Sequence, residues 1–314
     1  MAGATEARAR RLTTADVVRQ SLQGRRTDVP GLVFEGLLLL ALLISLGVLV
    51  TLLVDIWGRG SGVLFERGTD FLTGSLSSNP ARAGIGQGIF GSILVMLFVV
   101  VLAFPIGISA AIYLEEYARD TRLTRLLNTT VRNLAGVPSI VYGLLGLAVF
   151  VVALSPITGG RSVLSGGLTL AILVLPIVII TSAEALRAVP ASIREAGYGV
   201  GATKWEVTRS HVLPYAAPGV LTGTILSLSR AFGETAPLIL VGAVTGGFSV
   251  ATTDVVERLQ GPYTALPTIV FTWARLPNQE FRALTAAAII VLLGLILIIN
   301  ATAILLRNRY DRRW

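Results

Sequence analysis

The 314-residue sequence contains no cysteine, a single histidine and few charged side chains. Without cysteine, the chain can form neither a disulfide nor a thiolate nucleophile nor a cysteine-ligated metal site. The lone imidazole of His211 cannot build a zinc site by itself, so we expect no metal and no cofactor. Charged residues account for only 14% of the chain, whereas soluble domains carry about a quarter. This shortage of charge is typical of a protein whose solvent is lipid.

Long apolar runs take the place of the missing charges. Hydrophobic residues make up 53% of the sequence. A helix that crosses the ~30 Å hydrocarbon core of a bilayer needs about 20 mostly apolar residues. We therefore predict an all-α membrane protein with about six transmembrane helices. The six segments are Leu32–Trp57, Gly88–Leu114, Leu134–Leu154, Val163–Ala183, Pro214–Ala243 and Ala283–Leu306.

The distribution of Lys and Arg between these segments predicts how the chain is oriented. The positive-inside rule places the connections that are richer in these residues in the cytoplasm. Residues 1–31 hold six of them, and residues 115–133, 184–213 and 307–314 hold four each, whereas the other three connections hold seven together. We therefore expect both termini to be cytoplasmic.

Three regions follow from this topology. We expect a basic cytoplasmic tail in residues 1–31, a transmembrane domain in residues 32–306 and a basic cytoplasmic C-terminus in residues 307–314. In a soluble protein the net charge of +8 would suggest binding to nucleic acid. Here the positive-inside rule explains it, so we expect membrane lipid and no nucleic acid as a partner.

The cytoplasmic connection after the fourth segment contains two signals for the start of a helix. Ser192 precedes Glu195 by three residues, and Thr203 precedes Glu206 by three. Both pairs fit a capping box, in which a hydroxyl and a carboxylate bind free amides of the first helical turn. Gly201 lies between them, where a sharp turn is expected. The loop should fold as a helix, a glycine turn and a second helix.

The first of these helices has one face of small and apolar side chains. Ile193, Ala196, Gly197 and Val200 are spaced three and four residues apart and so share a face. One interpretation is that this face docks against another protein. The alternative is a helix at the membrane surface that packs only on its own transmembrane domain. The pattern alone does not separate the two.

The same loop resembles a known motif. The run Glu195-Ala196-Gly197, followed by Gly201 and later by Leu213-Pro214, is similar to the EAA loop of ABC importer permeases. Gly197 stands where a second alanine is usual in that family. The glycine preserves a small side chain, so the resemblance still implies a coupling helix that sits in a groove of a cytoplasmic ATPase.

His211 is a second departure, because an aliphatic residue is usual at its position. We interpret it as a tolerated residue at the membrane surface. The residues that the resemblance assigns to ATPase coupling are Glu195, Ala196, Gly197, Gly201, Thr203 and Glu206.

Four further runs are similar to phosphate importer permeases. They are Ser229–Pro237, Ile112–Ala118, Gly136–Gly143 and Leu266–Trp273. The last run, together with the short basic C-terminus, resembles the PstA-type subunit more than its PstC-type partner. The similarity covers roughly residues 85–306.

This resemblance implies a permease subunit of an ATP-driven importer of inorganic phosphate in the bacterial plasma membrane. It implies three partners: a second, PstC-type permease, a cytoplasmic ATPase dimer and an extracytoplasmic phosphate-binding protein. The sequence contains no G-x-x-x-x-G-K-[ST] run, so we expect this chain to have no ATPase site and no enzyme activity of its own.

Two charged residues, Arg230 and Glu234, lie inside the fifth apolar segment. Spacing of four residues would put them on one helix face. A charge at the bilayer centre costs at least ~2.5–3.5 kcal/mol by insertion scales, so both should face protein or a water-filled cavity. We interpret them as substrate-pathway residues, with Arg230 as the fixed positive charge that selects an anion. The alternative is a structural ion pair that holds helices together.

Charges and loops near the two membrane surfaces have simpler interpretations. Glu115 and Glu116 end the second segment on the cytoplasmic side. We favour a structural role for them over contact with the ATPase. The two long outer connections, residues 58–87 and 244–282, could receive the extracytoplasmic binding protein.

Other functions stay open at this point. The first is a permease for another oxyanion, such as molybdate or sulfate. The second is a sensor or scaffold that reports phosphate status, which is compatible with transport. An intramembrane enzyme would need a nucleophile–base pair or metal ligands within the membrane. One interfacial histidine and one intramembrane glutamate do not supply them.

Overall fold

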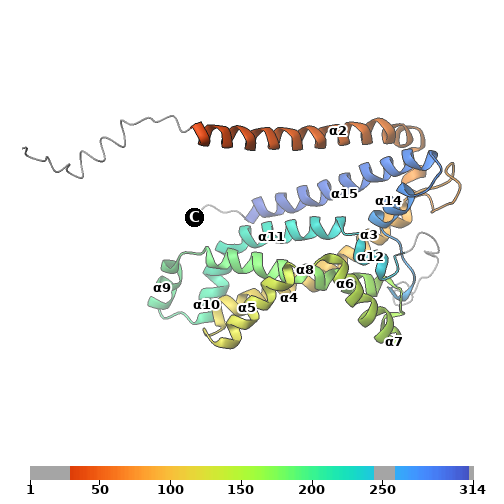
Figure 1. Ribbon diagram of the computed structural model, residues 1–314. Helices are drawn as coiled ribbons and strands as arrows, with labels where there is room; N and C mark the ends of the chain where they lie inside the picture. Colours follow the sequence, from red (N-terminus) through yellow and green to blue (C-terminus); the bar gives the residue numbers. More distant parts are fainter. Residues whose placement is uncertain (1–28, 244–258, 311–314) are drawn as a thin grey trace, which may run out of the picture. The chain divides into compact units, whose positions relative to one another are not determined.

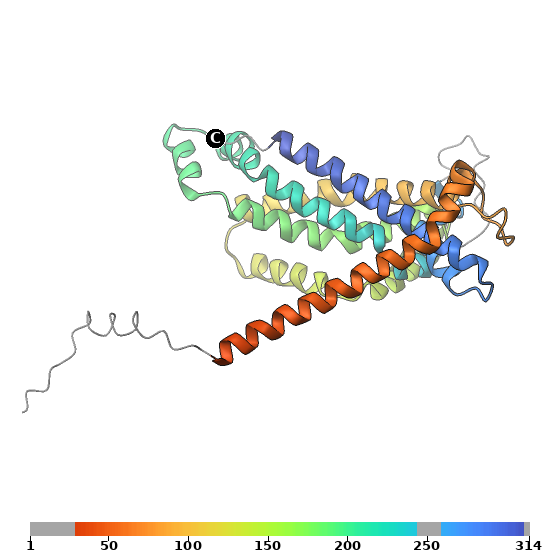
Figure 2. The ribbon, with the colours of Figure 1, turned by 90° about the horizontal axis from the view of Figure 1, so that it is seen from above.

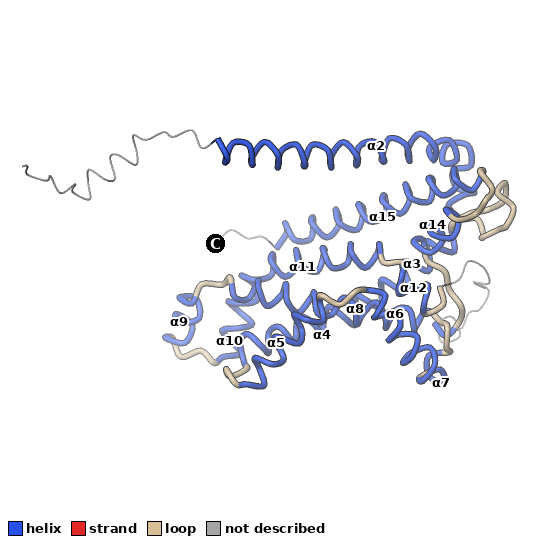
Figure 3. The backbone as a smooth tube through the Cα atoms, viewed as in Figure 1, coloured by secondary structure: helices blue, strands red, loops and turns tan. Residues whose placement is uncertain are grey.

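The computed structural model describes residues 29–243 and 259–310. Figure 3 shows that the described part of the chain consists of helices joined by short loops, with no strand among them. It divides into two compact units, residues 1–55 and 56–314. The predicted tail at 1–31 and the predicted C-terminus at 307–314 lie largely outside the described residues.

The first unit is described from Val29 onward and is part of one long helix. This helix, α2 (Val29–Thr73), begins in the first unit and ends in the second. The prediction that it ends at Trp57 is therefore wrong. The helical hydrogen bonding continues for 16 residues more, with one break in geometry at Gly68, where φ is +41°. Glycine tolerates that angle because it has no Cβ.

The second transmembrane helix is continuous from Gly86 to Tyr117. It consists of α3 (Gly86–Phe98), η1 (Val99–Ala103), α4 (Phe104–Ile112) and η2 (Tyr113–Tyr117). The two η elements are single turns of π-helix. Pro105 lies inside this continuous helix, just after the π-turn η1. Local π-helical adjustments of this kind let membrane helices tolerate the missing N–H of a proline.

The third segment differs from its prediction. A span at Leu134–Leu154 was expected, but α5 (Arg122–Ala135) already forms a helix before it. After a break before Pro138, the chain continues as α6 (Ser139–Gly146) and η3 (Leu147–Ala153), bent by 100° from α5. A proline disfavours helical geometry in the residue before it, which explains the position of the break. The short helix α7 (Ser155–Thr158) follows.

Helix α8 (Val163–Arg187) lies at the centre of the second unit. It packs against α4 on one side and α11 (Leu213–Gly233) on the other (Figure 1). Figure 2 shows α8 and α11 side by side. Glycines make these contacts close: a Cβ on Gly107 of α4 or on Gly219 of α11 would lie 2.8 Å from an α8 side chain. Small residues are the usual means by which membrane helices approach one another.

Short helices lie at the two ends of the second unit, and one long helix, α15 (Glu280–Tyr310), runs between them. Figure 1 places α9 (Ala191–Gly199) and α10 (Lys204–Val207) at one end. The other end holds α7, α12 (Ala236–Leu240) and α14 (Leu266–Ala274). The turn η4 (Thr208–Val212) joins α10 to α11, and α15 packs against α11 and α14.

The prediction of about six membrane-spanning helices is confirmed. Five helices of the described chain are long and apolar enough to cross a membrane, and there are six if the bent pair around Pro138 is counted as one broken span. The five are Val29–Thr73, Gly86–Tyr117, Val163–Arg187, Lys204–Gly233 and Glu280–Leu305.

The close packing of the second helix gives a test of the fold. A Cβ on Gly91 of α3 would overlap the backbone carbonyl of Thr264. We expect Gly91→Ala to lower the thermal unfolding midpoint of the purified protein in detergent, because overpacking costs about 1–3 kcal/mol. Gly294→Ala is the matched control, since a Cβ there would meet nothing within 4 Å. An equal midpoint for both variants would contradict this packing.

Candidate functional site

Helix α11 ends inside the fifth apolar segment, which was predicted to be continuous from Pro214 to Ala243. The helix stops at Gly233, Glu234 is extended with ψ of 118°, and α12 begins at Ala236. Pro237 explains the break, because its ring would clash with the carbonyl four residues earlier in a continuous helix. Open backbone at membrane depth is tolerated where it is buried in protein or lines a water-filled cavity.

Arg230 and Glu234 lie on either side of this helix end. The Nε of Arg230 is 3.5 Å from Oε1 of Glu234. The sequence analysis paired these two residues because they are four positions apart, and the structure does bring them together. Glu234, however, lies just past the end of the helix. The Glu234 side chain is 16% exposed and that of Arg230 is 52% exposed. The carboxylate is mostly covered by the protein, and the guanidinium is about half exposed.

The exposure of the Arg230 side chain limits what can lie next to it in the membrane. The residue lies about 25 Å along α11 from Leu213, at ~1.5 Å per residue, close to the end of this helix at Gly233. Exposure of its charge to lipid would cost at least ~2.5–3.5 kcal/mol. The half-exposed guanidinium is therefore a group that fits against another protein or an aqueous path.

Asn300 is a neighbour of this site that the sequence analysis missed. The hydroxyl of Ser229, next to Arg230, lies 2.5 Å from Oδ1 of Asn300 on α15. Side-chain hydrogen bonds of this kind join membrane helices and set their rotation. A signal was present, because Asn300 is an isolated amide within an otherwise apolar segment.

The loop between α8 and α11 folds largely as predicted. Thr203 forms a capping box, since its N–H donates to Oε2 of Glu206 at 2.7 Å and its hydroxyl accepts from the N–H of Glu206 at 3.4 Å. Gly201 makes the turn with φ of +83°. The predicted box at Ser192 is wrong, because α9 already begins at Ala191 with Pro190 as its N-cap.

The apolar face predicted on α9 is divided between two environments. Gly197 is buried and faces Val207, so a Cβ there would lie 2.7 Å from a Val207 methyl group. Ile193 packs against the same buried cluster. Through these two residues α9 packs against its own chain rather than against a partner. The exposed side of α9 carries Ser192, Glu195, Ala196 and Gly199, and the C-cap residue Val200 is also exposed.

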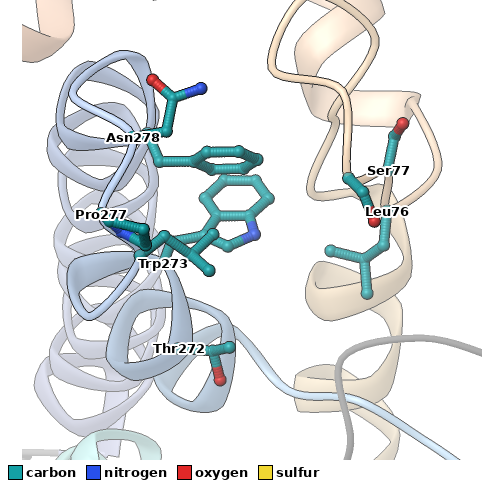
Figure 4. A pocket seen from close by; sticks show the side chains of 9 residues that line it. Leu76, Ser77, Thr272, Trp273, Pro277 and Asn278 are labelled. Atoms are coloured by element: carbon teal, nitrogen blue, oxygen red, sulfur yellow. The ribbon is translucent and has the colours of Figure 1, made fainter.

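A cavity of about 390 Å³ lies at the opposite end of the second unit. Figure 4 shows Thr272, Trp273, Pro277 and Asn278 on one side of it and Leu76 and Ser77 on the other. The Trp273 ring is supported by Phe281, with 5.5 Å between the ring centroids. The two walls belong to the two outer connections that were expected to receive a partner, although residues 244–258 of the second lie outside the described chain.

Comparisons with known proteins identify the family. The family model described as binding-protein-dependent transport system inner membrane component matches residues 103–312. The phosphate transport system permease protein PstA of Yersinia pestis is 35% identical over 225 residues, which is 72% of each chain. PstA 1 of Mycobacterium tuberculosis is 33% identical over 269 residues, which is 84% of each chain.

Solved structures share the fold. A bacterial alginate ABC transporter chain matches with a TM-score of 0.63 at 13% identity, over 92% of this chain and 94% of that one. A chain of the MetNI methionine ABC transporter, in an inward-facing conformation, matches with a TM-score of 0.58 at 18% identity, over 75% and 100%. The matched family region contains both α9 and Arg230. This chain therefore belongs to the family of inner membrane components of binding-protein-dependent transport systems.

Proposed function

We propose that this chain is the PstA-type transmembrane subunit of an ATP-driven importer of inorganic phosphate. A second, PstC-type permease completes the pathway, and an ATPase dimer binds the cytoplasmic face. An extracytoplasmic phosphate-binding protein delivers the anion. The chain lies in the bacterial plasma membrane with both termini in the cytoplasm, and it hydrolyses no ATP itself.

Arg230 is the observation that carries this proposal. A guanidinium stays protonated and offers a planar fork of donors that fits phosphate oxygens. Its open face lies beside a helix break, and transporters commonly build substrate sites from discontinuous helices. Relatives of this chain carry the printed name phosphate transport system permease protein, which supports phosphate as the anion.

Glu234 has two tasks in the proposed pathway. Its carboxylate holds Arg230 in place between transport events. It also accepts a hydrogen bond from the OH of a protonated phosphate. A fully deprotonated oxyanion such as sulfate has no donor to offer and is repelled by the carboxylate. Binding at this site is weak, because a pathway site must also release its ion.

The exposed side of α9 is the proposed coupling surface. In the proposed cycle, ATP closes the ATPase dimer, and the loop that contains Glu195 and Gly201 moves with it. The pathway then changes from inward-open to outward-open, and phosphate passes Arg230. The cavity around Trp273, at the other end of the unit, receives a side chain of the phosphate-binding protein.

Removal of the pathway charge is the first test. We expect Arg230→Gln to abolish uptake of radiolabelled phosphate in cells that lack the native chain, because the neutral amide no longer attracts the anion. Arg122→Gln, a matched change at an exposed site in the first turn of α5, should leave uptake near the wild-type rate. Normal uptake by Arg230→Gln, with the ATPase still co-purified, would refute the pathway role.

Replacement of the acceptor tests the discrimination against sulfate. Wild-type uptake should be competed by arsenate and not by sulfate. In Glu234→Gln the repelling charge is gone and the new amide can donate to a sulfate oxygen, so sulfate should become a competitor. An unchanged competition profile would assign Glu234 a purely structural role.

Reversal of charge on α9 tests the coupling surface. We expect Glu195→Arg to reduce co-purification of the ATPase from detergent extracts and to abolish uptake. Glu66→Arg makes the same reversal at an exposed site on α2 and should retain the ATPase. Equal recovery of the ATPase with both variants would argue against docking at α9.

A further inference from the structure

The cytoplasmic end of the second transmembrane helix makes an unusual set of contacts with the coupling loop. Glu115, Glu116 and Tyr117 are consecutive residues of the π-helical turn η2. Each of them contacts a different cation, and the three cations come from three successive elements: Arg187 ends α8, Arg194 lies on α9 and Lys204 begins α10. We call these six residues the cytoplasmic clamp.

The central contact of the clamp is buried. Nη2 of Arg194 lies 2.7 Å from Oε1 of Glu116, and the two side chains are 22% and 4% exposed. The Nε of Arg194 donates to the same carboxylate at 3.2 Å. Burial of Glu116 excludes the alternative in which it contacts the ATPase directly.

Arg194 also binds one carbonyl in the last turn of α8 and one just beyond it. Its Nη2 donates to the carbonyl of Leu186 at 2.9 Å, and its Nη1 donates to the carbonyl of Val189 at 2.8 Å. The last carbonyls of a helix have no partner within it, and an arginine can satisfy them. A single guanidinium therefore joins α9, α8 and η2.

The two outer contacts fix the same turn from its other sides. Arg187 donates to Glu115 at 2.7 Å, and Nζ of Lys204 lies 5.3 Å from the centre of the Tyr117 ring. The three contacts lie around a π-helical turn, whose successive side chains point in different directions. Its wider hydrogen bond runs from the N–H of Ala118 to the carbonyl of Tyr113 at 2.8 Å. Such turns often occur at functional sites.

The other end of the same helix is fastened to the outer elements. The hydroxyl of Ser92 accepts a hydrogen bond from the N–H of Leu266, at the start of α14, at 2.8 Å. Gly91 permits close contact with Thr264. The helix Gly86–Tyr117 thus connects the coupling loop with the wall of the outer cavity, over a length of about 48 Å at ~1.5 Å per residue.

We propose that the Glu116–Arg194 pair is the link through which movement of α9 enters the transmembrane helices, and that α9 and η2 move as one body throughout the ATP cycle. Glu116 and Arg194 are positioning residues for transport. This inference rests on the proposed function, because it assumes that an ATPase moves α9. The new element is the route, through Glu116 and the helix Gly86–Tyr117, by which that movement reaches the outer face.

Coupling efficiency tests the clamp. The purified complex, with its ATPase and binding protein, is placed in liposomes, and phosphate import per ATP hydrolysed is measured. Glu116→Gln and Arg194→Gln should each keep the ATPase bound and hydrolysing, while the ratio falls at least tenfold. Asp120→Asn is the matched control, because its pair with Arg125 is also cytoplasmic but has side chains 81% and 68% exposed. That variant should keep the wild-type ratio.

The outcomes of this experiment separate the hypotheses. A wild-type ratio in Glu116→Gln would overturn the clamp, and so would loss of the ATPase from that variant, since the pair would then serve assembly. Arg194→Lys retains the charge but loses the fork and should recover only part of the ratio. An intact wild-type complex that imports no phosphate would refute the proposed function instead.

A distance measurement tests whether α9 and η2 move together, and it does not depend on phosphate transport. The chain has no cysteine, so Tyr113→Cys and Gly199→Cys introduce two unique thiols for spin labels, on η2 and α9, both exposed. In the assembled complex their separation should stay constant when ATP and vanadate are added. It should change or broaden when Glu116→Gln is also present. A change in the otherwise unmodified chain would show that α9 and η2 separate, which would overturn the proposal.

Discussion

Lipid offers no hydrogen bonds to an open backbone, and this constraint governs where the chain is helical and where it is not. The long helices satisfy their own amides. At Glu234 and Thr235, where α11 stops, the chain needs protein or water to cover it. The charged pair of Arg230 and Glu234 lies at this point. The open backbone at Glu234 and Thr235 requires a polar environment, and an anion in the membrane would require the same environment.

Close packing converts a set of helices into a unit that can transmit movement. Glycines on α3, α4 and α11 let neighbouring backbones approach closely, and α8, with 15 of its 25 residues buried, lies at the centre. Hydroxyls inside the packed region turn to nearby carbonyls, as Thr169 does toward Ser165 at 2.7 Å. A movement applied at the end that holds α9 and α10 would therefore displace whole helices.

Much of the fold could be predicted because hydropathy and local signals are short-range properties. The apolar runs predicted the spans, and Gly201 and Thr203 predicted the turn and the helix start in the loop. Three errors arose at prolines: Pro138 and Pro237 break predicted spans, and Pro190 displaces the predicted cap at Ser192. The first helix runs beyond Trp57 because helical hydrogen bonding continues past the apolar run. The contacts of Glu115 and Glu116 join residues 72 and 78 positions apart, and a single sequence holds no information about such distances. The side of α9 that faces inward depends on the same long-range packing, as Gly197 shows.

The exposure of Arg230 affects how long an unassembled copy of the protein would survive in the membrane. A copy without its partner would hold this charge against lipid, at a cost of at least ~2.5–3.5 kcal/mol, in a molecule whose total stability is only about 5–15 kcal/mol. Unassembled copies would then spend more time partly unfolded and become substrates for membrane proteases. The residue proposed to select the anion would then also limit the number of unassembled subunits.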